Sequence, residues 1–185
     1  MIHKHVEVLE GVRIFTTKQI SDSRGTFTKF EPMDLLKAES ISIAFSHNPK
    51  IGTIRGMHFQ SAPFSEEKIV SCIQGALFDV AIDLRPGSRT FGNWMSIEIH
   101  AQNALHVFLP KGIAHGFQTL SLDSIVHYVL TGTYSQEHAM TIDPLSFPGL
   151  VWPIKDYTLS DRDCAGITFE TAARSYADSM KNLEK

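Results

Sequence analysis

The sequence has few cysteines, almost no charge imbalance and no long apolar run. Its two cysteines, Cys72 and Cys164, lack CxxC spacing, fit a reducing compartment and need no structural role. Seventeen basic against twenty acidic residues give a formal charge of -3 without a Lys/Arg cluster, which argues against nucleic-acid binding. No stretch approaches the roughly 20 apolar residues of a membrane span, and the N-terminus lacks a secretory apolar core. These absences predict a cytoplasmic protein without nucleic-acid or membrane partners.

Most of the chain consists of short segments in which apolar and polar residues alternate, each ended by turn residues. Examples are VRIFTTKQI, KIVSCI, ALFDVAIDL, LHVFL and IVHYVL. The pattern runs from about Val12 to about Tyr134 and predicts an all-β fold, an antiparallel barrel or jelly roll. Helical composition is limited to residues 32–40 and to the C-terminal stretch from Thr171, which predicts two peripheral helices.

The length and the 43% apolar content are typical of one globular domain. About two-thirds of the unfolded surface can be buried at this length, so the fold needs no metal or disulfide. We expect a single domain over residues 1–185, with a barrel core at about 12–153 and a tail at 154–185.

Several polar residues occupy strand positions that can face the interior. In the segment RGMHFQ, His58 and Gln60 share one strand face, and Gly56 permits close backbone approach by a ligand. Lys68 opens a strand, and Asp83 lies in an otherwise apolar one. Buried charges are costly unless they are paired, so inward-facing Lys68 and Asp83 are site candidates, but a solvent-facing position is about as plausible for each.

The segment Pro110–Phe117 carries a P-x-G-x-x-H pattern that resembles the second half-motif of cupin jelly rolls, whose His points into the barrel. That His is His115. A cupin metal site would also require His-x-His followed by Glu, whereas this chain has His58-x-Gln60 and then Lys68, so we expect no metal. Inward His and Lys side chains without a metal fit proton abstraction beside a carbonyl, with a cation holding the enolate oxygen.

Nearly the whole chain resembles the nucleotide-sugar 3,5-epimerases typified by dTDP-4-dehydrorhamnose 3,5-epimerase. The matching pieces are collinear and specific only in combination. They are DSRGTF (22–27), TIRGMHFQ (53–60), KIV (68–70), GALFDVAIDLR (75–85), SRTFG (88–92), PKGIAHGF (110–117), Tyr128, Trp152-Pro153 and LSDRD (159–163).

The resemblance implies a cupin barrel that works without a cofactor. It assigns His58 as the general base, Asp163 as its orienting carboxylate, and Tyr128 as the acid on the opposite face of the sugar. Lys68 would stabilise the enolate, with His115 and Asp83 supporting the site.

The resemblance also implies a nucleoside diphosphate sugar as substrate and a homodimer. Arg24 and Arg55 match diphosphate contacts, for which a planar guanidinium is suited. Phe27, Gln60 and Tyr134 complete the substrate-binding set. Because N-terminal strands are exchanged in the family, Arg24 and Phe27 could serve the neighbouring subunit's site.

Three segments depart from the family pattern. Lys29 replaces an acidic residue, Ile43–Asn48 lacks the usual Gln and Asn, and the loop at 135–144 is shorter and lacks a Trp-Asn pair. The reaction class is therefore expected to be an epimerisation of a nucleoside diphosphate 4-keto-6-deoxy sugar at C3 and C5. A 3-only epimerase, a 3,4-ketoisomerase and a non-catalytic sugar-nucleotide-binding cupin remain alternatives.

Overall fold

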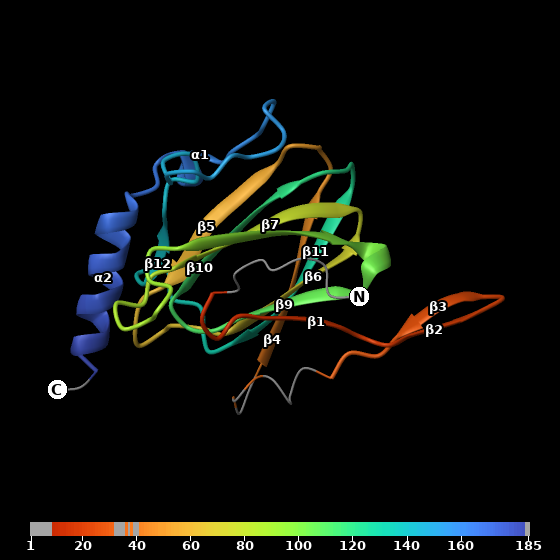
Figure 1. Cartoon of the computed structure of the whole chain (residues 1–185), viewed down its shortest axis with the longest axis horizontal. Coiled ribbons are helices and arrows are strands. Elements are labelled where there is room, and N and C mark those ends of the chain that lie inside the picture. Colours follow the sequence, from red (N-terminus) through yellow and green to blue (C-terminus); the bar gives the residue numbers. More distant parts are fainter. Residues whose placement is uncertain (1–8, 32–35, 37, 39–40, 184–185) are drawn as a thin grey trace.

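Two antiparallel five-stranded sheets packed face to face form the body of the molecule (Figure 1). The computed structural model describes residues 9–31, 36, 38 and 41–183. One sheet has the order β1 (Arg13–Thr16), β9 (Leu105–Leu109), β6 (Lys68–Gln74), β11 (Ser124–Thr131), β4 (Ile41–Asn48). The other has the order β12 (Ala139–Thr141), β5 (Ile54–Gln60), β10 (Ile113–Thr119), β7 (Ala76–Asp83), β8 (Trp94–His100). The predicted all-β, cupin-type jelly roll is confirmed, although β4 and β12 were not among the predicted segments.

The core between the sheets follows from side-chain alternation along the strands. Val126 and Tyr128 of β11 belong to the cluster between the sheets, together with Phe117 of β10. Val129 packs instead into a separate cluster on the outer face of the first sheet, and His127 contacts the ring of Phe45. One strand therefore supplies a residue to the interior and a residue to the outer face, as the period-2 pattern predicts.

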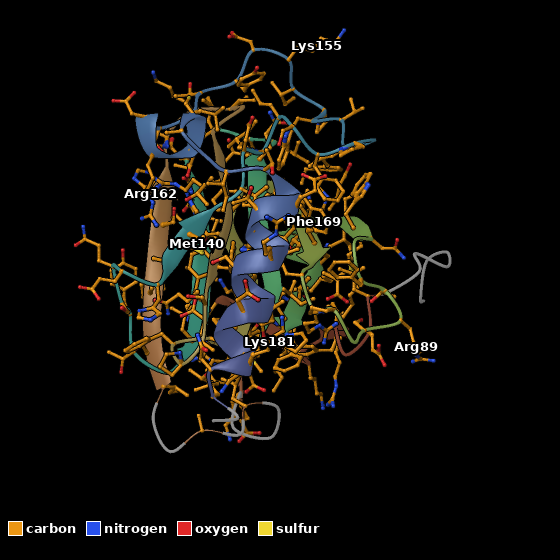
Figure 2. The ribbon with its side chains drawn as sticks, turned by 90° about the vertical axis from the view of Figure 1, so that its left-hand side faces the viewer. Arg89, Met140, Lys155, Arg162, Phe169 and Lys181 are labelled. Atoms are coloured by element: carbon orange, nitrogen blue, oxygen red, sulfur yellow. The ribbon has the colours of Figure 1, made fainter. Side chains whose placement is uncertain are left out.

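The C-terminal helix α2 (Phe169–Lys181) covers the outer face of the second sheet. Its buried residues Ala172 and Tyr176 pack with Val80 and Ile82 of β7. Figure 2 shows the helix from Phe169 to Lys181, with Met140 of β12 nearby, and Ser175 Oγ lies 3.3 Å from Met140 Sδ. This confirms the predicted C-terminal helix, whereas the expected helix at 32–40 falls mostly outside the described residues.

Three smaller elements lie around the two sheets. The four-residue helix α1 (Asp161–Cys164), which was not predicted, precedes α2, and η2 (Ala101–Asn103) follows β8. The hairpin of β2 (Gln19–Asp22) and β3 (Gly25–Thr28) projects from the body, and all of its strand residues are exposed (Figure 1). Within the described part of the chain, no helix is long and apolar enough to cross a membrane.

Candidate active site

His58 and Asp163 meet although 105 positions separate them in the chain: Nε2 of His58 lies 2.6 Å from Asp163 Oδ1. His58 is on β5, and Asp163 is on α1. The segment before α1 runs beside the start of β5, where the backbone N–H of Ile54 donates to the carbonyl of Thr158. Ser160 caps α1 by accepting from the backbone N–H of Asp163. The cap and the backbone pairing together hold the carboxylate beside the imidazole.

The environment of Asp163 favours the ionised carboxylate. Burial alone would raise its pKa, but hydrogen bonds from His58, from Ser160 and from the backbone of Gly56 act against burial and lower the pKa of Asp163 overall. An ionised Asp163 accepts from Nε2–H, which leaves Nδ1 of His58 as the nitrogen able to take a proton. The His58 side chain is 40% exposed and the Asp163 side chain 4%, so the imidazole is accessible while its carboxylate partner is shielded.

Two glycines allow β5 and β10 to approach closely at this point. Gly56 has φ +129, and a Cβ there would lie 2.5 Å from the Cα of Gly116; a Cβ on Gly116 would lie 2.6 Å from Met57 Sδ. Gly56 was expected to make room for a ligand. The structure shows that it makes room for the neighbouring strand, because the backbone of Gly116 occupies that space. Close to this point, the backbones of His58 on β5 and His115 on β10 lie opposite each other in the antiparallel register.

His115 has a carboxylate partner that the sequence did not identify. Its Nε2 lies 2.7 Å from Asp79 Oδ1, and both side chains are buried. The ring of His115 meets Tyr128 edge-on, with 6.3 Å between centroids. Burial, followed by the nearby Asp79 carboxylate, raises the pKa of Tyr128, so the phenol stays protonated at neutral pH.

Asp83 was expected to support the site, but its carboxylate is used elsewhere. It is fully buried and receives hydrogen bonds from Arg85, Ser88 and Thr90. Although burial opposes ionisation, these donors together lower the pKa of Asp83. The residue of β7 that contacts a site histidine is therefore Asp79, four positions earlier and on the same strand face.

Lys68 is buried, and its ammonium has an acidic neighbour. Nζ lies 3.2 Å from Glu66 Oε1, and the Lys68 side chain is 9% exposed.

Gln60, expected to bind substrate, forms hydrogen bonds within the protein through its side-chain amide. Nε2 donates to Phe64 O, Thr133 O and Glu66 Oε2, and Oε1 accepts from the Ser135 N–H. The side chain of Tyr134, between those two loop residues, is exposed.

The two arginines expected to contact the diphosphate, Arg55 and Arg24, lie in separate regions of the chain's structure. Arg55 is exposed at the start of β5, where its Nε donates to Asn48 Oδ1 at 2.7 Å. Arg24 lies in the β2–β3 hairpin and pairs with Asp22 at 2.6 Å. Phe27 is on the same hairpin, 64% exposed. Within one chain, Arg24 and Phe27 are therefore not brought to the His58 side chain, whereas Arg55 shares its strand.

Ile43 and Phe45 stand where the family pattern has polar residues, and they do not face the barrel interior. Both are exposed, at 59% and 64%, and they alternate along β4 with the half-buried Ala44 and Ser46. The departure from the family pattern at these positions therefore alters the outer surface of this chain rather than its interior.

No group of three or more His, Cys, Asp or Glu side chains in the described ranges is arranged to hold a metal ion. What the interior provides is a His–Asp pair, a protonated Tyr, a buried Lys and a second His–Asp pair. Such a set transfers protons and stabilises negative charge. The fold and the site together define an acid–base enzyme in a cupin-type barrel.

Comparison with known proteins specifies the class further. The family model for dTDP-4-dehydrorhamnose 3,5-epimerase matches residues 7–171. A dTDP-4-dehydrorhamnose 3,5-epimerase of Sinorhizobium fredii is 37% identical over 82% of each chain. A dTDP-4-dehydrorhamnose 3-epimerase of Streptomyces niveus is 34% identical over 84% of this chain and 78% of its own. The chain belongs to the dTDP-4-dehydrorhamnose 3,5-epimerase family and is an isomerase.

Solved structures agree with this assignment. The crystal structure of a dTDP-6-deoxy-D-glucose-3,5-epimerase from Legionella pneumophila, in complex with dTDP-4-keto-L-rhamnose, superposes with a TM-score of 0.80 at 32% identity. The match covers 86% of this chain and 88% of that one. The shared fold extends through most of both chains, including the two-sheet body.

Proposed function

We propose that this enzyme epimerises a dTDP-4-keto-6-deoxy sugar at C3 and C5, with His58 as the base and Tyr128 as the acid. The observation that carries the proposal is the 2.6 Å His58–Asp163 pair on one side and, on the facing sheet, a half-buried Tyr128 that stays protonated. The 4-keto group acidifies the C–H bonds on both sides of it, so one site can act on two carbons in succession.

Inversion needs proton removal on one face of the sugar and return on the other. His58 is on the sheet that contains β5 and β10, and Tyr128 is on the facing sheet that contains β6 and β11. A sugar bound between the sheets has one residue on each side. His58 Nδ1 takes the proton, the C–H electrons move to the carbonyl oxygen as an enolate, and Tyr128 delivers a proton to the opposite face.

Lys68 and the Asp163 carboxylate stabilise the charges that form. The ammonium of Lys68, at the start of β6, is the buried cation available to the enolate oxygen. Asp163 stabilises the imidazolium that His58 becomes. Loss of Lys68 is expected to reduce the rate by about 100- to 1000-fold, as for other groups that stabilise an oxyanion.

The test is proton NMR of dTDP-4-keto-6-deoxyglucose in deuterated water. Wild-type enzyme should introduce deuterium at C3 and C5 and invert both carbons, and His58→Ala should abolish both events. His100→Ala, which changes a partly exposed histidine at the end of β8, is the matched control and should act like wild type. Binding without exchange would contradict the proposal and favour a binding cupin, and a shifted carbonyl without inversion would favour a 3,4-ketoisomerase.

A 3-only epimerase is the second candidate, favoured by the similarity to the Streptomyces niveus 3-epimerase over 84% of this chain. It predicts deuterium and inversion at C3 alone. For either candidate, Tyr128→Phe tests the acid, because it leaves the base in place. Deuterium exchange should continue while formation of the inverted product falls sharply.

The proposal includes a homodimer in which the hairpin of one subunit completes the site of the other. The hairpin strands are fully exposed and carry Ile20 and Phe27, two large apolar side chains. Arg24 on the same hairpin could then reach a diphosphate bound near the neighbour's Arg55. A subunit interface accounts for this apolar exposure, since isolated sheet ribbons are seldom left uncovered.

Subunit complementation tests this arrangement. Arg24→Ala and His58→Ala are each expected to be nearly inactive, but after mixing and subunit exchange about a quarter of the sites should be intact by random pairing. Activity that stays at the sum of the separate variants would show that Arg24 serves its own chain.

A cytoplasmic location is also proposed, in keeping with the free thiols of Cys72 and Cys164.

A further inference from the structure

Glu66 lies between two side chains of the interior and contacts both of them. Its Oε1 is 3.2 Å from Lys68 Nζ, and its Oε2 accepts from Gln60 Nε2, also at 3.2 Å. The Glu66 side chain is only 16% exposed. Neither the family resemblance nor the acid–base mechanism assigns this carboxylate a role.

The ammonium of Lys68 has apolar neighbours on both adjacent strands. Its register partners are Leu109 on β9 and Leu130 on β11. A buried ammonium loses hydration and needs a compensating partner. Across the described interior, the other carboxylates near the site are committed to histidines, Asp163 to His58 and Asp79 to His115. Glu66 is the carboxylate paired with Lys68.

The other oxygen of Glu66 connects Lys68 to the loop after β11. Gln60 donates the hydrogen bond to this oxygen. It also holds the backbone on both sides of Tyr134, because it donates to Thr133 O at 3.3 Å and accepts from Ser135 N–H at 2.8 Å. A continuous chain of polar contacts therefore runs from the Lys68 ammonium through Glu66 and Gln60 to the Tyr134 loop.

We propose that Glu66 is a positioning residue of the epimerase: it holds the Lys68 ammonium at the enolate oxygen and fixes it relative to the Tyr134 loop. The inference rests on the function proposed above and adds a residue that acts through Lys68 rather than on the sugar. Without Glu66, the ammonium can turn away from the enolate oxygen, and the loop loses one of the contacts that orient Gln60.

The experiment measures the rate of deuterium incorporation into dTDP-4-keto-6-deoxyglucose. Glu66→Gln should lower kcat by about 10- to 100-fold, less than complete loss of an oxyanion-stabilising group, and change KM by no more than about threefold. Glu67→Gln is the matched control: its backbone keeps the hydrogen bonds to Thr131, and its carboxylate has no hydrogen bond or ion pair within the described residues. It should stay within about twofold of wild type.

A double-mutant cycle separates positioning from general structural support. In a Lys68→Met background, the Glu66→Gln change should have almost no further effect on kcat, because the group through which it acts is gone. Glu66→Asp keeps the charge and should recover part of kcat relative to Glu66→Gln. Thermal melting and dTDP binding of each variant check that the fold is intact.

Three results would overturn the inference while leaving the proposed function standing: Glu66→Gln as fast as Glu67→Gln, an undiminished effect in the Lys68→Met background, or Glu66→Asp no faster than Glu66→Gln. A wild-type enzyme that exchanges no deuterium would instead remove the proposed function, and the inference with it.

Discussion

The two faces of the sheet β1-β9-β6-β11-β4 both bury polar side chains, but they provide different partners. On the inner side, Lys68 faces a carboxylate, and the histidines of the opposite sheet pair with Asp163 and Asp79. On the outer side, the hydrogen-bond partners of His106 among the described residues are two hydroxyl groups, Ser71 at 2.6 Å and Thr17 at 3.0 Å. The inner groups can carry charge during a reaction, whereas the outer histidine is held neutral.

The surroundings of His106 show why it stays neutral. Its ring packs against the rings of Phe15 and Phe30, with centroid distances of 5.2 and 4.8 Å, and those two rings lie 6.2 Å from each other. Burial, with a smaller contribution from nearby His127, lowers the pKa of His106 to about 4. A neutral imidazole can accept from one hydroxyl and donate to the other. Burial of a histidine therefore does not by itself indicate a catalytic role; the chemistry of its partners separates the two cases.

The largest expected effect comes from removing a carboxylate partner on the inner side. Asp163→Asn keeps the shape of the side chain but loses the charge that stabilises an imidazolium on His58, so kcat should fall by about 10²- to 10⁴-fold. Single-turnover exchange by NMR measures the loss. Asp123→Asn, which alters the exposed His47–Asp123 pair, is the control and should leave kcat unchanged. Equal rates in the two variants would remove Asp163 from the mechanism.

The second prediction concerns stability in acid and depends on the outer histidine. Because the folded-state pKa of His106 is about 4, below its ordinary value of 6.5, the unfolded chain takes up this proton first as the pH falls. Stability should therefore decrease from about pH 6.5 down to about pH 4, by about 3 kcal/mol from this residue. Urea unfolding at fixed protein concentration measures it. The His106→Gln variant should show a shallower decline, and an identical pH profile would contradict the assignment.

The third prediction tests the hydroxyl partner itself. Ser71→Ala leaves Nδ1 of His106 without a hydrogen bond in a buried position, since Ser71 is 2% exposed. The free energy of unfolding should fall by about 1–3 kcal/mol, and kcat per folded molecule should be unchanged. Chemical unfolding combined with the exchange assay checks both parts. The exposed Ser42→Ala on β4 is the control, with an expected change within about 0.5 kcal/mol.

The smallest effect is expected where a histidine pairs with a carboxylate in solvent. His47 and Asp123 are 3.3 Å apart, with side chains 60% and 61% exposed. His47→Ala should change the free energy of unfolding by less than about 1 kcal/mol, because water screens an exposed pair. A larger loss by urea unfolding would mean that carboxylate pairing alone, without burial, stabilises this fold.

Local pattern was sufficient for much of the fold. Alternation along β11 places Tyr128 and Val126 in the core cluster and Val129 in the outer one, as the structure confirms. Alternation could not select between Asp79 and Asp83, because residues four apart on a strand share a face. The choice depends on pairing with β10, where Phe117 lies opposite Asp79 and Ile113 opposite Asp83.

The His58–Asp163 pair shows a second limit. No local signal links two residues 105 positions apart, and only the resemblance to a family joined them. Gln60 and Gly56 were placed correctly on a strand, but their roles depend on neighbours that the strand itself does not specify. Glu66 gave no sequence signal, because its importance comes from contacts that form only after β5 and β6 are assembled.

The position of Asp163, on a four-residue helix directly before the last helix, has a consequence for synthesis of the chain. His58 leaves the ribosome with the first third of the protein, yet its partner follows only after both sheets have been translated. A nascent chain therefore carries the imidazole long before it can be oriented. A product terminated before α1 would still contain the residues of every strand that the structure describes, but its His58 imidazole would lack the carboxylate partner.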